Sequence, residues 1–156
     1  MTTNSKIDSY LSKHYDEKQL LDRYRISFET MWLTFLLIFV SGMVKIFYGP
    51  WAADNTEMMV LVSLPIAYFM VRSVLKGAYF SVQQKSYAGT LIFLAAIGLL
   101  NIGISAVSLM NNGSIIENGM LSENLFQFFL GLPFILIPIA YLIKKKVGKN
   151  DAEDDE

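Results

Sequence analysis

Four long apolar segments constrain this sequence more than any other feature. They cover residues 30–48, 58–75, 88–110 and 125–143. A helix needs about 17–25 mostly apolar residues to cross a bilayer, and its backbone groups must be hydrogen-bonded within the segment. The segments lack the polar–apolar alternation of membrane barrel strands. The sequence therefore predicts an all-α fold, an integral membrane bundle of four transmembrane helices.

The bundle is expected to occupy residues 30–144, between two charged segments. Residues 1–29 predict a cytoplasmic amphipathic helix, with its apolar side chains on one side. This helix could lie on the membrane surface, bind a partner, or extend the first transmembrane helix into water. Its histidine, His14, is expected to be solvated. Residues 145–156 predict a disordered charged tail.

The distribution of basic residues predicts the orientation. Twelve of the thirteen Lys and Arg residues fall in the N-terminal segment, around the link between the second and third segments, and at the C-terminal end. The two remaining loops, residues 49–57 and 111–124, contain acids but no Lys or Arg. The positive-inside rule then places both termini in the cytoplasm, with the protein in the bacterial cytoplasmic membrane.

Catalytic and metal-binding motifs are absent from the sequence. It has no cysteine and one histidine, which leaves no thiolate site and no nucleophilic cysteine. No phosphate-binding, dinucleotide-binding, hydrolase or metalloprotease motif occurs. We therefore expect a protein that is not an enzyme, with no cofactor, no metal and no nucleic-acid partner.

Charged residues near the ends of the first two apolar segments are the first candidate polar contacts between helices. Glu29 and Arg72 belong to the predicted cytoplasmic end, whereas Lys45 and Glu57 belong to the other. Glu29 and Lys45 are about 160° apart on a straight helix, which cannot then present both to its neighbour. The prediction is a Glu29–Arg72 ion pair, with Lys45 in a looser contact with Glu57 or reaching the headgroups.

Two polar stripes supply the other candidates. Glu57, Tyr68, Arg72 and Tyr79 lie within about 60° on a helical wheel. In the third segment the stripe consists of small residues and Asn101, which needs a hydrogen-bond partner near the middle of a membrane. Packing between helices is the favoured interpretation of both stripes, and the alternative is the wall of a polar cavity.

The first half of the chain resembles uncharacterised small four-helix membrane proteins of Gram-positive bacteria. The similarity consists of Glu29, Val44-Lys45, Glu57, the pair Tyr68-x-x-x-Arg72, and Gly77. Those proteins are often encoded beside a short helix-turn-helix regulator. The resemblance implies a sensory or regulatory membrane partner and no catalytic residue.

These observations favour a non-enzymatic integral membrane protein that binds a partner in a regulatory or immunity-type role. The expected partners are membrane lipid and a membrane or regulatory protein. The alternative is a small transporter or channel, formed as a homo-oligomer because four short helices barely enclose a pathway. A membrane enzyme acting on lipid is a third, weaker hypothesis.

Overall fold

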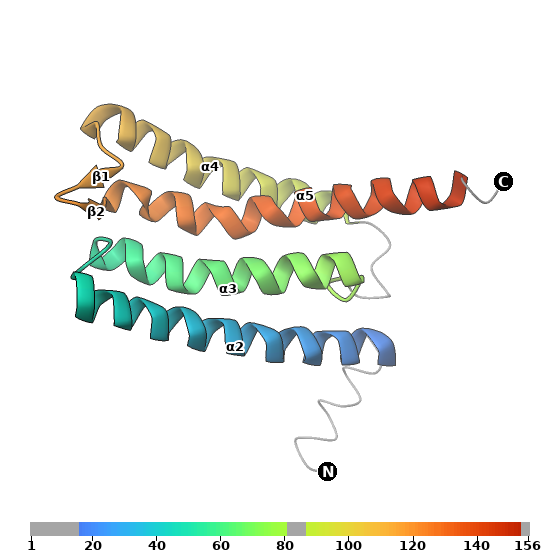
Figure 1. Ribbon diagram of the computed structural model, residues 1–156. Helices are drawn as coiled ribbons and strands as arrows, with labels where there is room; N and C mark the ends of the chain where they lie inside the picture. The colour runs from blue at the N-terminus through green and yellow to red at the C-terminus, as the bar shows by residue number, and fades with distance from the viewer. Residues whose placement is uncertain (1–15, 81–86, 154–156) are drawn as a thin grey trace, which may run out of the picture.

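The computed structural model describes residues 16–80 and 87–153, which are almost entirely helical. The helices, labelled as in Figure 1, are α2 (Glu17–Tyr48), α3 (Asp54–Lys76), α4 (Ala88–Asn112) and α5 (Phe126–Glu153). Short strands β1 (Ile116–Glu117) and β2 (Met120–Leu121) and the 3-10 turn η1 (Glu123–Leu125) link α4 to α5. The predicted all-α fold is confirmed, and all four helices are long and apolar enough to span a membrane.

Local sequence signals fix several helix ends. Asp16 caps α2, because its side chain accepts a hydrogen bond from the Lys18 amide while the Gln19 side chain accepts one from the Asp16 amide. Gly77 ends α3 in the left-handed conformation, with φ of 76°, which glycine adopts without a steric penalty. The side-chain Nε2 of Gln19 also donates to the Gly77 carbonyl at 2.8 Å and joins the start of α2 to the end of α3.

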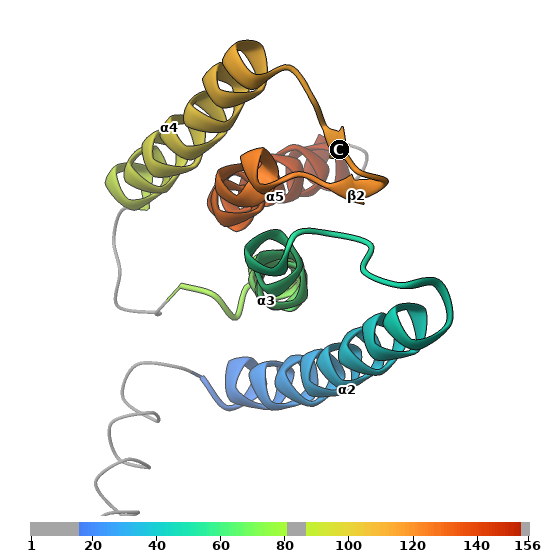
Figure 2. The same ribbon diagram turned by 90° about the vertical axis from the view of Figure 1, so that its left-hand side faces the viewer.

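The four helices form an open row in the order α2, α3, α5, α4 (Figures 1 and 2). The central helix α3 packs against both α2 and α5, whereas α2 lies at one edge and packs mainly against α3. The central helix is more buried than the edge helix, since 33% of the most apolar part of α3 is buried but only 6% of that of α2. Most of α2 is therefore exposed to whatever surrounds the protein.

Helices α4 and α5 approach closely because two glycines face each other. A Cβ atom on Gly131 would lie 2.8 Å from the Gly98 carbonyl oxygen and 2.9 Å from the Asn101 Cβ atom. Small residues at such crossings allow backbones to come together and maximise dispersion contacts. The small-residue stripe of the third apolar segment thus packs against α5.

A β-hairpin closes the end of the molecule where α2 meets α3 and α4 meets α5, which we call the hairpin end. Asn118 and Gly119, with φ of 53° and 80°, form the two-residue turn typical of tight hairpins. Leu121 in β2 pairs with the α2–α3 link, donating to the Trp51 carbonyl and accepting from the Ala53 amide. The hairpin therefore joins the two halves of the row.

Of the alternatives for the N-terminal segment, the structure shows residues 17–29 extending the first apolar helix, because α2 continues through them without a break. Two expectations from the sequence need correction. The predicted disorder is wrong for residues 145–153, where α5 continues to Glu153, since lysine, alanine and glutamate favour helix. Tyr79 lies beyond the end of α3 and is not part of its stripe. His14, the first part of the amphipathic segment and residues 154–156 lie outside the described residues.

The contact between Gly98 and Gly131 predicts that an alanine substitution is destabilising at one glycine and tolerated at another. Gly131→Ala forces a methyl group against the α4 backbone and should destabilise the protein by about 1–3 kcal/mol. Gly103→Ala is the matched control, because its Cβ would meet nothing within 4 Å. Thermal unfolding in detergent should show a lower midpoint for Gly131→Ala and no loss for Gly103→Ala. Equal midpoints would contradict the close approach.

Candidate functional site

A buried carboxylate at the hairpin end organises one polar cluster. Both oxygens of Glu57 are engaged: Oε1 accepts a hydrogen bond from the Ser41 hydroxyl at 2.5 Å, and Oε2 pairs with the Lys45 ammonium at 2.5 Å. The Trp51 indole donates to the Ser41 hydroxyl oxygen at 2.9 Å. Asp54 lies 3.9 Å from the Lys45 ammonium. The cluster holds a glutamate side chain that is only 9% exposed.

The surrounding backbone positions this cluster. Asp54 and Glu57 occupy the first turn of α3, where the helix dipole favours negative charge. Trp51 precedes Ala52, which is 1% exposed and pairs with Leu121 of the hairpin. The Thr56 hydroxyl donates to the Ser122 carbonyl at 2.9 Å and anchors the same turn. The start of α3 is thus fixed from two sides.

A second cluster lies at the opposite end of the α2–α3 contact, around Glu29. Its Oε2 atom accepts from the Tyr68 hydroxyl at 2.8 Å and from Arg72 Nη2 at 3.3 Å. Its Oε1 atom accepts from Arg25, one helical turn earlier, at 3.3 Å. The Arg72 guanidinium also lies 5.8 Å from the centre of the Tyr68 ring, a favourable cation–π position.

The structure brings together both charged pairs, including the one that the helical wheel seemed to exclude. Ile26 and Ser41, both buried, occupy the α2 face between Glu29 and Lys45, about 60° and 120° around the helix from Glu29. The two charged residues therefore lie at opposite edges of one contact face. Long side chains then reach across from each edge, so the argument that a straight helix cannot present both is wrong.

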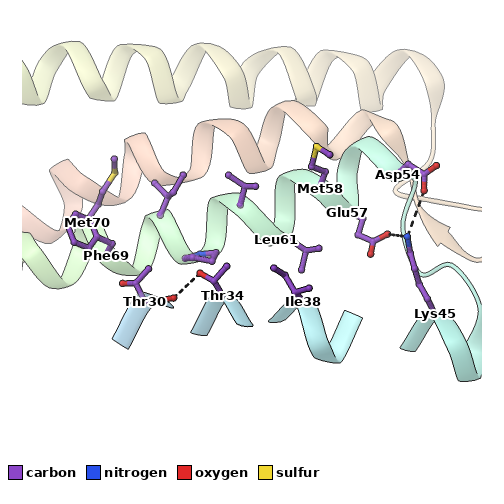
Figure 3. Close-up of a pocket in the computed structure, with 13 residues that line it drawn as sticks. Thr30, Thr34, Ile38, Lys45, Asp54, Glu57, Met58, Leu61, Phe69 and Met70 are labelled. Atoms are coloured by element: carbon purple, nitrogen blue, oxygen red, sulfur yellow. Dashed lines mark hydrogen bonds and ion pairs between the residues drawn. The ribbon is translucent and has the colours of Figure 1, made fainter. Parts of the chain in front are cut away.

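A groove of about 890 Å³ runs along α2 and α3 between the clusters. Figure 3 shows Thr30, Thr34 and Ile38 of α2 facing Leu61 and Phe69 of α3 across it. At its hairpin end the lining changes to Lys45, Asp54 and Glu57. The α2–α3 contact is thus polar at both ends and hollow and apolar between them.

Asn101, the remaining candidate, lies outside this contact. Its side-chain amide donates to the Ile97 carbonyl of its own helix at 2.9 Å, rather than to a neighbouring helix, and its Cβ atom packs against Gly131. Hydrogen bonds from α4 to the turn η1 come instead from Ser105 and Ser108, which donate to the Asn124 carbonyl and side-chain oxygen, each at 2.6 Å.

Two features escaped the sequence analysis. Ser41 and Trp51 complete the Glu57 cluster, and only the register of α2 against α3 identifies them. The second feature is an exposed seam along α2, which could have been found from its alternating spacing of four and three residues. The seam consists of Phe28, Trp32, Phe35, Phe39, Gly42 and Ile46.

The described clusters consist of ion pairs and hydrogen bonds, most of which join α2 to α3. Within residues 16–80 and 87–153, no group of three or more His, Cys, Asp or Glu side chains could hold a metal ion.

The hairpin-end pair predicts unequal effects of removing either charge. Lys45→Met leaves Glu57 buried without a counter-charge, which is strongly unfavourable. Glu57→Gln leaves a lysine whose side chain is 40% exposed and able to reach polar surroundings. Thermal unfolding should show a larger fall in midpoint for Lys45→Met than for Glu57→Gln.

The Lys45→Met/Glu57→Gln double variant should regain most of that loss, because neither charge is left unpaired. The exposed Lys146→Met is a control for the loss of one positive charge. Additive losses in the double variant would contradict direct coupling of the pair.

Comparison with known proteins places the whole arrangement within one family. The model of a family of unknown function, DUF6773, matches residues 12–150. This range includes the four helices up to residue 150, both polar clusters, the groove and the seam. No curated protein and no solved structure matches the chain. Because the family model matches most of the sequence, the chain belongs to the DUF6773 family.

Proposed function

We propose that this chain is a non-enzymatic integral membrane protein that binds a second membrane protein through α2. Support for the membrane location comes from the four long apolar helices. Support for cytoplasmic termini comes from the placement of charge, because Lys45 is the one basic residue near the hairpin end of the described chain. This orientation places the Glu57 cluster on the outer side of the cytoplasmic membrane.

The observation that carries the proposal is the seam on α2. Its six residues lie within about 80° of one another on a helical wheel, on the side of α2 away from α3. Its aromatic side chains are exposed, from 57% for Phe35 to 65% for Phe39. Trp32 meets Phe28 and Phe35 edge to face, with ring centres 6.2 and 6.3 Å away.

The spacing of the seam favours a helix as its partner. Intervals of four and three residues keep a stripe directed at a neighbouring helix that crosses at a small angle. A Cβ on Gly42 would meet nothing within 4 Å, so a second backbone can approach there, as at other glycine-containing crossings in membranes. Large aromatic residues commonly dominate the energy of protein interfaces.

The transport alternative receives less support from the polar stripes. Tyr68 and Arg72 are paired with Glu29, and Ser105 donates to the carbonyl of Asn124 in η1. These groups are engaged in contacts between helices and within the loop. The binding role therefore accounts for more of the geometry, and the resemblance noted above makes that role a regulatory one.

The seam predicts which substitutions release the partner. In a pull-down from gently solubilised native membranes, the tagged wild type should retain a membrane protein in stoichiometric amount. Trp32→Ala should weaken this association at least tenfold, because truncating a central aromatic contact costs about 2 kcal/mol or more. Phe93→Ala is the matched control, since Phe93 is a 64% exposed aromatic residue on α4.

Equal recovery of the partner with Trp32→Ala and Phe93→Ala would contradict binding at the seam. Recovery of only a second copy of the chain would contradict a heterologous partner and favour the oligomeric alternative.

A further inference from the structure

The groove between α2 and α3 is a separate surface from the seam. From Thr30 to Lys45 it follows fifteen helical residues, a length of about 22 Å. Its volume is about 890 Å³. The groove is therefore long enough for an extended hydrocarbon chain.

The walls of the groove offer no free hydroxyl hydrogen for a polar ligand. Its two threonines donate within their own helix, Thr30 to the Ile26 carbonyl and Thr34 to the Thr30 carbonyl. The other lining residues between the charged end and the threonines are apolar, including Leu61, Val62 and Ile66. Hydrocarbon is the chemistry that such walls accommodate.

The charged residues at the hairpin end of the groove determine which lipid headgroup could bind there. Lys45 and Glu57 neutralise each other, and Asp54 adds one negative charge on a side chain that is 96% exposed. An ammonium has three donors, so Lys45 can bind a phosphate while it remains paired with Glu57. Asp54, beside it, can accept from an amine. An anionic headgroup without an amine would meet a site with a net charge of about −1 at neutral pH.

We propose that the α2–α3 groove binds one phospholipid with a zwitterionic, primary-amine headgroup. One acyl chain of this lipid lies between Ile38 and Leu61, the phosphate contacts Lys45, and the headgroup ammonium contacts Asp54. One leaflet of hydrocarbon is about 15 Å thick, so a chain that enters at the charged end fits within the length of the groove. This inference is independent of the protein partner, because the seam occupies another side of α2.

Lipid selection by the full-length protein tests the proposal. The protein is placed in nanodiscs with equal amounts of phosphatidylethanolamine, phosphatidylcholine and phosphatidylglycerol bearing the same acyl chains. After release into the gas phase, native mass spectrometry counts the lipids that remain bound. The wild type should retain one phosphatidylethanolamine per chain, at least tenfold more often than phosphatidylglycerol.

Two pairs of variants distinguish lipid bound at a specific site from bulk lipid. Asp54→Asn should remove the preference for phosphatidylethanolamine, whereas Glu123→Gln, an acid outside the groove, should preserve it. Ile66→Trp fills the groove and should abolish the retained lipid. Leu99→Trp changes a residue of α4 that is 63% exposed and should leave the retained lipid unchanged.

Retention of the same lipids by Ile66→Trp and Leu99→Trp would overturn the proposal and identify bulk lipid only. Preference for phosphatidylglycerol, or equal retention of phosphatidylcholine and phosphatidylethanolamine, in the wild type would overturn the assigned headgroup. Trp32→Ala should retain the lipid in full, so loss of the protein partner and loss of the lipid are distinguishable.

Discussion

Ion pairs at the two ends of the α2–α3 contact hold the outermost helix of this protein in place. Helix α2 has one main neighbour and little burial, so apolar packing alone specifies its position weakly. Glu29 with Arg72, and Lys45 with Glu57, fix both its rotation and its register along α3. Glu57 is only 9% exposed, so leaving it without its counter-charge is costly.

This attachment leaves two surfaces of α2 available for different occupants. The edges of its α3-facing side are closed by charge, and the middle is a groove that suits a single hydrocarbon chain. The far side has an aromatic seam that suits a helix. At the other end of the row, the small residues of α4 are packed against α5. The attachment of one edge helix thus determines where the proposed lipid and protein partners would bind.

The sequence predicted the four helices well because hydrophobic length is a local property, readable without knowing the neighbours. It also contained the hairpin, since Asn118-Gly119 is a strong turn signal, but a loop interpretation overlooked it. Ser41 and Trp51 could not be predicted, because their roles depend on how α2 meets α3. The helical-wheel argument failed for Lys45 because it assumed that only a narrow strip of α2 faces α3. Long side chains reach α3 from either edge of a much broader contact face.

Pulsed electron paramagnetic resonance between α2 and α4 tests most directly whether the charged pairs position α2. The chain has no cysteine, so Leu36→Cys and Leu99→Cys introduce two labels at exposed sites, diluted with unlabelled protein to suppress signals between molecules. The account predicts one narrow distance distribution, which broadens when Glu29→Gln and Glu57→Gln are added together. An unchanged distribution in that variant would contradict it, because apolar packing would then be sufficient to hold α2.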